Sequence, residues 1–465
     1  MTTTQPNIHP PTASPAPAKP GVKDVMAGRS LKRRVYHSSA WSMGAWGINQ
    51  TLHLASNLIL TRLLFPEAFG LMALCSVFIS IISLFSDFGL RTNIIQSKRG
   101  DDPRFLNTAW TIKVIKGFVL WGLVSAGAYP FALAYGEPML AWMLPVIGFN
   151  AVIGGFGSTA KTTMSRHMAL GRLTVVSTIS LGLKILVMVG VALVWPSVWA
   201  LVIGTTFSAL FGLAVSHLYF ARITGTRNRF EWDRQAFREI YRFGRWVLVT
   251  KLLGFMVSQG DKLILGAFMP TAAFGVYTIA SMMANKPMAG AGQISGGAFF
   301  PAYSKLRHLP PHEMRKRLAK SRLVLMAIFL PLLWLLAITG ESIINFLYDD
   351  RYFGAGWMTQ VLVLGHIVRL STHPGGFLFS RGNSFAVMIL TTIQGAIFLT
   401  CMAVGGWFWG TPGLIWGVAI THLIYYPCDI VMQRRYGVWA PAVDMAGLLS
   451  SAVVIIAGLY LTGAL

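Results

Sequence analysis

The chain has few charged residues and very few acidic ones. Only 12% of its 465 residues are charged and 54% are hydrophobic, whereas a soluble domain usually has about 25% charged residues. This composition excludes an ordinary water-soluble enzyme. The 16 Asp and Glu are outnumbered by 39 Lys and Arg, which gives a formal net charge of +23. Such an excess suits nucleic acid or an anionic membrane surface, and the hydrophobic fraction favours the membrane over nucleic acid.

The sequence also lacks the patterns of metal and disulfide sites. Its three cysteines, Cys75, Cys401 and Cys428, are far apart in apolar runs, which excludes a disulfide framework and a CxxC pair. No HExxH motif or carboxylate cluster is present, so we expect no metal, no cofactor and no catalytic residue. Residues 1–35 combine prolines with no apolar run. They are predicted to form a disordered cytoplasmic tail, and not a signal peptide.

Apolar stretches of about 20 residues follow one another from residue 39, and each can cross a hydrocarbon core of ~30 Å as a helix. The predicted spans are thirteen: 39–63, 68–90, 108–134, 139–160, 172–195, 198–220, 244–268, 272–298, 322–340, 356–380, 384–409, 412–432 and 443–463. Loops on one side collect Lys and Arg, whereas the opposite loops hold only Arg62 and Arg351. Because cytoplasmic loops are basic, the N-terminus is predicted to be cytoplasmic and the C-terminus outside.

A repeated segment relates the two halves of the chain. LILTRLLFPEAFG at 58–70 aligns without gaps with LILGAFMPTAAFG at 263–275, and both copies end the first span of a six-helix block. An even number of spans per block gives the halves the same orientation. The predicted fold is therefore an all-α integral membrane protein with two parallel-oriented six-helix lobes. Its parts are a lobe at 36–222, a basic interfacial linker helix at 223–243, a lobe at 244–435, and an extra transmembrane helix at 443–463.

Polar side chains occur at helical spacing inside several predicted spans, so each such span has a polar face. In lipid these faces must point toward the protein interior. Hydrogen bonding between helices is the alternative interpretation for each single Ser or Asn. The candidates for a polar cavity lining are Asn49, Gln50, His53, Asn57 and Asn285.

Basic residues inside the spans are harder to explain by helix packing. A charge at the bilayer centre costs at least ~2.5–3.5 kcal/mol on insertion scales. The deep cations are Lys184, Lys251, Lys262, Lys286 and Arg369. The only acids that we identify inside the spans are Asp87 and Asp261, and Asp261 could simply pair with a neighbouring cation. The interior is therefore predicted to be net positive, which indicates a site for an anion.

Three segments resemble a known family: LTRLLFPEAFGLMAL at 60–74, SDFGLRTNIIQ at 86–96 and GDKLILGAFMPTAAFGVYTIA at 260–280. They are similar to oligosaccharide flippases of the MOP superfamily, in particular Wzx-type and related polysaccharide transporters, over about residues 36–435. The resemblance implies a V-shaped pair of lobes that alternate in access, without enzymatic activity. It also implies that a polyprenyl-diphosphate-linked oligosaccharide is moved from the cytoplasmic to the outer leaflet of the bacterial inner membrane. The thirteenth span exceeds the usual twelve.

On this interpretation the five deep cations contact the diphosphate, since Lys and Arg are the preferred phosphate ligands. The five polar candidates contact the glycan, and Asp87 or Asp261 holds a coupling ion. His366 and His373 flank Arg369, and we interpret them as hydrogen-bonded interior histidines. Expected partners are membrane lipids and other polysaccharide assembly proteins, but not nucleic acid.

Two other functions compete with this prediction. A MATE-like multidrug exporter would have the same architecture, but organic cations need acidic residues in the cavity, and span 39–63 has none. A membrane glycan polymerase or glycosyltransferase would need a large extramembrane loop or a carboxylate pair at one interface. No outer loop is long enough for that.

Overall fold

The computed structural model describes residues 31–86, 90–97, 99–167, 170–299, 303, 306, 309–373, 377 and 384–461, and these residues form helices and no strand. The first half contains α1 (Leu31–Leu63), α2 (Pro66–Ser86), α3 (Leu90–Gln96), α4 (Pro103–Tyr135), α5 (Met139–Phe156), α6 (Ala160–Arg166), α7 (Leu170–Val194), α8 (Trp199–Val215), η2 (Ser216–Phe220) and α9 (Ala221–Thr224). The second half contains α10 (Arg234–Phe268), α11 (Thr271–Ile294), η3 (Ser295–Phe299), α13 (Pro311–Leu347), η4 (Asp350–Tyr352), α14 (Ala355–Thr372), α16 (Ser384–Arg435) and α17 (Pro441–Leu461).

A helix stands at every predicted span. Within the described residues, 8 helices are long and apolar enough to cross a membrane by length and composition. One of them, α16, covers two predicted spans and bends at Gly410, where φ is 61°. The helices α1, α10, α11 and α14 are not among the 8. These four helices hold most of the polar and basic candidates, which lower their hydropathy.

Two boundaries differ from the prediction. Helix α1 is described from Leu31, so residues 31–35, predicted as part of the tail, are helical and continuous with the helix of the first span; residues 1–30 lie outside the described residues. The linker helix and the seventh span, predicted to meet at 243/244, form the single helix α10. Hydropathy changes at that point and Gly244 stands there, but neither a change in hydropathy nor a single glycine has to end a helix.

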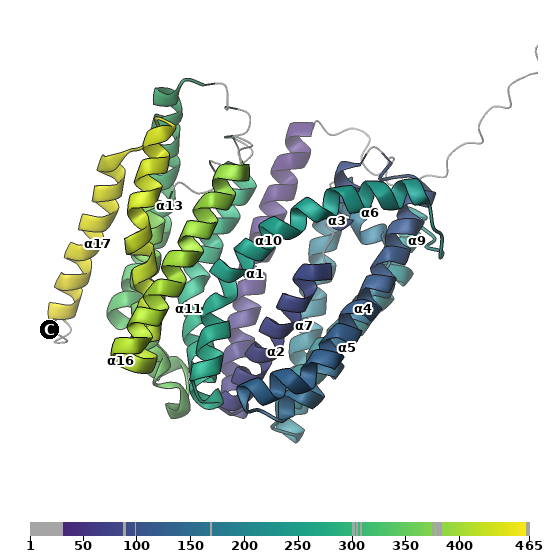
Figure 1. Cartoon of the computed structure of the whole chain (residues 1–465), viewed down its shortest axis with the longest axis horizontal. Helices are drawn as coiled ribbons and strands as arrows, with labels where there is room; N and C mark the ends of the chain where they lie inside the picture. The colour runs from purple at the N-terminus through teal and green to yellow at the C-terminus, as the bar shows by residue number, and fades with distance from the viewer. Residues whose placement is uncertain are drawn as a thin grey trace, which may run out of the picture.

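The N-terminal part of α10 lies across one end of the first lobe, as Figure 1 shows, and α10 then descends into the middle of the molecule. Asp233 caps α10 by accepting a hydrogen bond from the Gln235 backbone N–H at 2.8 Å. On α10, Ile240 is buried in one cluster with Phe105, whereas Trp232, just before the helix, is exposed. The end of the lobes that carries α3, α6, α9 and the start of α10 is called the basic end below.

The two lobes meet at the opposite end, called the closed end below, where α2 packs against α11. The repeat glycines lie at this contact. A Cβ atom on Gly275 would lie 1.9 Å from the Pro66 carbonyl oxygen, and one on Gly70 would lie 2.3 Å from that of Thr271. Only glycine permits backbones to approach this closely. The sequence repeat therefore coincides with the contact between the lobes.

Hydrogen bonds between the lobes also gather at the closed end. The buried Asn57 amide donates to the Tyr348 hydroxyl at 2.7 Å, and the Tyr352 hydroxyl donates to the Leu64 carbonyl at 3.1 Å. The Tyr135 hydroxyl reaches the Leu263 carbonyl at 3.0 Å. In the described conformation these bonds hold the closed end together.

The thirteenth predicted span, α17, packs against α13 and α14 on the far side of the second lobe (Figure 1). Near its start the Asp444 carboxylate accepts from the Arg322 guanidinium of α13 at 2.5 Å. The Tyr426 hydroxyl and the Trp439 indole N–H donate to the same carboxylate at 2.9 and 3.1 Å. A buried ion pair therefore joins this helix to the lobe.

Candidate functional site

Lysines from both lobes lie close enough to His53 on α1 for their charges to act on it. Lys184 comes from α7 in the first lobe and Lys286 from α11 in the second, and the positive charges of both act on His53. Helix α1 packs along α7, where the Thr178 hydroxyl donates to the Asn49 side-chain oxygen at 3.0 Å. His53 is one turn beyond Asn49 on α1, and its side chain is exposed. The structure thus brings together three of the predicted site residues at the boundary between the lobes.

Several of the deep cations have no recorded hydrogen bond or ion pair within the described residues. Among the described residues, no hydrogen bond or ion pair is recorded for Lys184, Lys286 or Arg369, and the ammonium of Lys286 is itself buried. A buried charge without a partner costs several kcal/mol because it has lost its hydration. Lys262, half-buried toward the closed end of α10, is likewise without a recorded ion pair in the part of the chain that is described. The arrangement can therefore be neutralised by an anion between the lobes.

Other predicted polar residues are placed differently. Asn57 is buried at the closed end and bonded to Tyr348, so it lines no cavity in this conformation. Asn285 is exposed, and its amide donates to the Ser281 carbonyl at 2.8 Å. Gln50 is half-buried on α1. Of the five polar candidates, His53 is the one on which the charges of Lys184 and Lys286 are recorded to act. His53, Lys184 and Lys286 are called the cationic centre below.

Of the two acids predicted to hold a coupling ion, the structure describes Asp261 but not Asp87. Asp261 accepts a hydrogen bond from the Tyr277 hydroxyl at 2.5 Å, so its recorded partner among the described residues is a hydroxyl and not a cation. Asp87 and the side chain of Lys251 lie outside the described residues. Their predicted roles remain predictions.

Two buried acids were missed by the sequence reasoning. Asp429 and Asp444 are almost fully buried in the second lobe, so Asp87 and Asp261 are not the only acids in the spans. Asp429 lies within predicted span 412–432 and Asp444 is the second residue of span 443–463, so a residue-by-residue reading of those spans would have found them.

The basic residues His366, Arg369 and His373 lie on α14 or directly after it, near the buried Asp429. His373 Nδ1 lies 3.2 Å from an Asp429 carboxylate oxygen, which confirms the hydrogen bond predicted for this histidine, although its side chain is 39% exposed. His366 is buried with neither ring nitrogen partnered among the described residues, so the same interpretation is wrong for His366. Arg369 is exposed although protein surrounds much of it, and the negative charge of Asp429 acts on it. Arg369 is therefore partly neutralised, unlike the lysines at His53.

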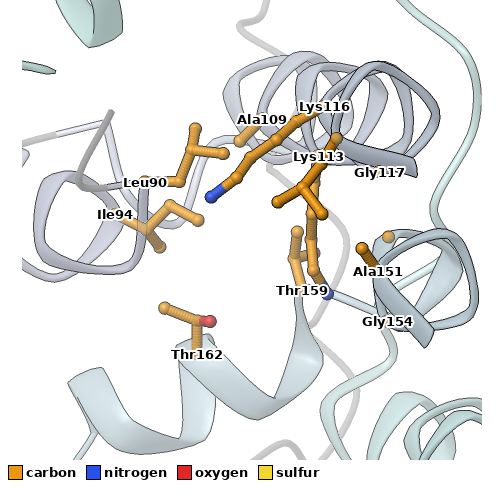
Figure 2. Close-up of a pocket in the computed structure, with 12 residues that line it drawn as sticks. Leu90, Ile94, Ala109, Lys113, Lys116, Gly117, Ala151, Gly154, Thr159 and Thr162 are labelled. Carbon is orange, nitrogen blue, oxygen red and sulfur yellow. The ribbon is translucent and has the colours of Figure 1, made fainter. Parts of the chain in front are cut away.

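A separate cavity of about 390 Å³ lies in the first lobe at its basic end, between α3, α4, α5 and α6. Figure 2 shows the amine of Lys116 pointing into the open space, whereas Lys113 reaches toward Thr159. The Lys113 ammonium donates to the Gly157 carbonyl at 2.8 Å. This cavity and the cationic centre at His53 are built from different helices.

The fold is that of an all-α, multi-pass membrane protein with two helical lobes. Solved structures with this fold include an inward-facing multidrug resistance MATE family transporter of the MOP superfamily, with a TM-score of 0.64 and 15% identity, covering 85% of this chain and 95% of that one. The lipid II flippase MurJ in an inward closed conformation gives a TM-score of 0.66 and 12% identity, covering 91% and 92%. At these identities the likeness shows the fold alone.

Residues 59–357 match the family described as "Polysaccharide biosynthesis protein", and the chain belongs to this family. It is 20% identical over 401 residues to the lipopolysaccharide biosynthesis protein WzxC of Escherichia coli, covering 85% of this chain and 80% of WzxC. It is 23% identical over 309 residues to the succinoglycan biosynthesis transport protein ExoT of Rhizobium meliloti, covering 66% of this chain and 60% of ExoT. The resemblance and the all-α fold class predicted from the sequence are confirmed.

Proposed function

We propose that the protein is a flippase that moves a polyprenyl-diphosphate-linked oligosaccharide from the cytoplasmic to the outer leaflet of a bacterial inner membrane. The observation that supports this proposal is that Lys184 and Lys286, one from each lobe, both act on His53 through their positive charges and have no recorded hydrogen bond or ion pair among the described residues. The names of the relatives support it, since they refer to polysaccharide biosynthesis and its transport. In this proposal the basic end and the N-terminus face the cytoplasm.

A diphosphate carries about two negative charges, so it can neutralise one lysine from each lobe at the same time. Each unneutralised cation at mid-membrane costs at least ~2.5–3.5 kcal/mol, and bound substrate would remove much of that cost. Because the lysines belong to different lobes, their shared anion favours approach of the lobes on the cytoplasmic side. The closed end would then open, and it would release Asn57 from Tyr348 so that it could contact the glycan.

The remaining predicted residues have roles within the same scheme. Lys251, Lys262 and Arg369 would contact the diphosphate along its path, while Asn49, Gln50 and Asn285 would contact the glycan. The membrane potential, at ~2.3 kcal/mol per charge per 100 mV, would favour outward movement of an anion-loaded centre. Asp87 or Asp261 would hold a coupling ion if the potential is not the source of energy.

A multidrug exporter is the second candidate because its fold is the same. The TM-scores to the MATE transporter and to MurJ, 0.64 and 0.66, do not separate the two functions. The charge of the proposed site favours the flippase, since Lys184 and Lys286 would repel an organic cation.

The test is deletion of the gene followed by analysis of lipid-linked oligosaccharides. Accumulation of an intact polyprenyl-diphosphate glycan on the cytoplasmic side supports a flippase. A truncated glycan would indicate a glycosyltransferase, and a normal glycan with lost drug resistance would indicate an exporter. Complementation with Lys184→Met or Lys286→Met should fail, whereas Lys320→Met, at an exposed position of α13, should restore the surface polysaccharide. Equal protein levels in the membrane fraction are the control.

A further inference from the structure

The cavity between α3, α4, α5 and α6 combines positive charge with apolar walls. Lys113 and Lys116 line it, together with Leu90, Ile94 and Leu120. The positive charges of Lys161 and Lys116 act on Lys113. A ligand that fits both kinds of wall has an anionic group joined to a hydrocarbon chain.

The walls of the cavity are fixed by hydrogen bonds. The Arg166 guanidinium donates to the carbonyl oxygens of Ile94, Ile95 and Ser97 at 2.9, 2.9 and 2.7 Å, which holds the short helix α3 in place. On the other side the Asn228 side-chain oxygen accepts from the Ser158 hydroxyl at 2.7 Å, just before α6. A preformed cavity requires little ordering when a ligand binds.

The cavity lies near the basic end of the predicted span 108–134. Lys113 and Lys116 come five and eight residues after the start of that span, which is ~8 and ~12 Å along the helix at 1.5 Å per residue, and a long lysine side chain can reach from there toward a headgroup. Ile115 and Phe118, their neighbours on α4, are exposed, so apolar surface lies beside the cavity. Basic pockets between transmembrane helices on the cytoplasmic side are known to bind anionic headgroups.

We propose that this cavity binds an anionic phospholipid of the leaflet at the basic end. Lys113 and Lys116 contact the phosphate, and one acyl chain lies along Leu90, Ile94 and Leu120. The volume of about 390 Å³ lies within the usual range of ~300–1,000 Å³ for small-ligand sites. It accommodates a headgroup with part of a chain and is too small for a lipid-linked oligosaccharide. The site is therefore independent of the proposed translocation site at His53.

The structure offers a substitution that blocks the cavity and keeps both lysines. Gly154 lines the cavity, and a Cβ atom placed on it would meet nothing within 4 Å. Gly154→Leu therefore extends a side chain into the cavity without a backbone clash. Gly122 on α4 is a matched control, because it is also exposed with open space around its Cβ position but does not line the cavity.

The experiment is native mass spectrometry of the full-length protein from nanodiscs that contain phosphatidylglycerol or phosphatidylcholine. The wild type and Gly122→Leu should retain phosphatidylglycerol in preference to phosphatidylcholine. Lys116→Met should weaken this retention roughly tenfold or more, as expected for loss of a charge-assisted hydrogen bond, and Gly154→Leu should abolish the preference. Lys320→Met controls for a general loss of positive charge.

Two results would overturn the proposal. One is retention of phosphatidylglycerol by Lys116→Met and Gly154→Leu at the wild-type level. The other is displacement of the lipid by millimolar inorganic phosphate as effectively as by phosphatidylglycerol, which would show that a free anion and not a lipid is the ligand. Because the measurement needs no transport, it can fail while the proposed flippase function holds, and the reverse also applies.

Discussion

Replacement of Arg322 by Met is expected to destabilise the second lobe by detaching α17. The Arg322 and Asp444 side chains are only 6% and 0% exposed, and the two charges lie 2.5 Å apart. Arg322 also donates to the Ser371 carbonyl and, at 3.4 Å, to the Gln433 side chain. Removing Arg322 therefore leaves a buried carboxylate whose recorded donors are two neutral groups.

The expected magnitude follows from this burial. Breaking a buried ion pair by removing one partner costs about 3–5 kcal/mol, because the other charge stays buried. Arg322→Met and Asp444→Asn should each fall in that range. The double variant removes both charges. Its loss of unfolding free energy should therefore be about 2–3 kcal/mol smaller than the sum of the losses in the two single variants.

The assay is denaturant unfolding of the detergent-solubilised protein, analysed as a double-mutant cycle. Arg317→Met is the matched control, since Arg317 is exposed on the same helix and should cost at most about 0.5 kcal/mol. Protease cleavage between α16 and α17 should increase only in the Arg322 and Asp444 variants. If Arg322→Met is no less stable than Arg317→Met, or if the cycle is additive, the ion pair does not anchor α17.

Three further results are expected. Tyr348→Phe removes the hydroxyl that accepts a hydrogen bond from the buried Asn57 amide at the closed end, so the closed conformation should be destabilised by about 1–3 kcal/mol. Electron spin resonance should then show a larger population with long lobe–lobe distances at that end. Gly275→Ala should also separate the lobes there, because its Cβ would clash with backbone, whereas Gly292→Ala on the same helix has open space and should not; equal distances in both variants would contradict this. The hydrogen bond from Arg99 lowers the pKa of Asp233 below its ordinary 3.8, so docking of the α10 start is fully stabilised above that pH and weakens as pH falls through the lower value. Pepsin cleavage at 225–233 should rise over that interval in the wild type, and Asp233→Asn should show no such dependence.

The spans were predictable because each is a local property of about 20 residues. The repeat predicted only the orientation of the halves, and the structure adds that its glycines lie at the contact between the lobes. The continuity of α10 was missed because hydropathy marks where a helix enters lipid and does not mark where it begins.

The candidate site was only partly predictable. Lys184 and Lys286 were found from the cost of a charge in a span, but their meeting at His53 depends on the rotation of three helices, which the sequence does not specify. Asn57 pairs with Tyr348, 291 positions away, and no periodicity indicates a contact at that separation.

The contact between the repeats has a symmetry of its own. Gly70 faces Thr271, and Gly275 faces Pro66, while Thr271 and Pro66 are themselves equivalent in the alignment of the repeat. Each half therefore presents the same patch to the other, as the subunits of a two-fold symmetric dimer do. A half of this chain carries at that turn the surface needed to pair with a copy of itself. Two halves expressed as separate chains should accordingly assemble through it.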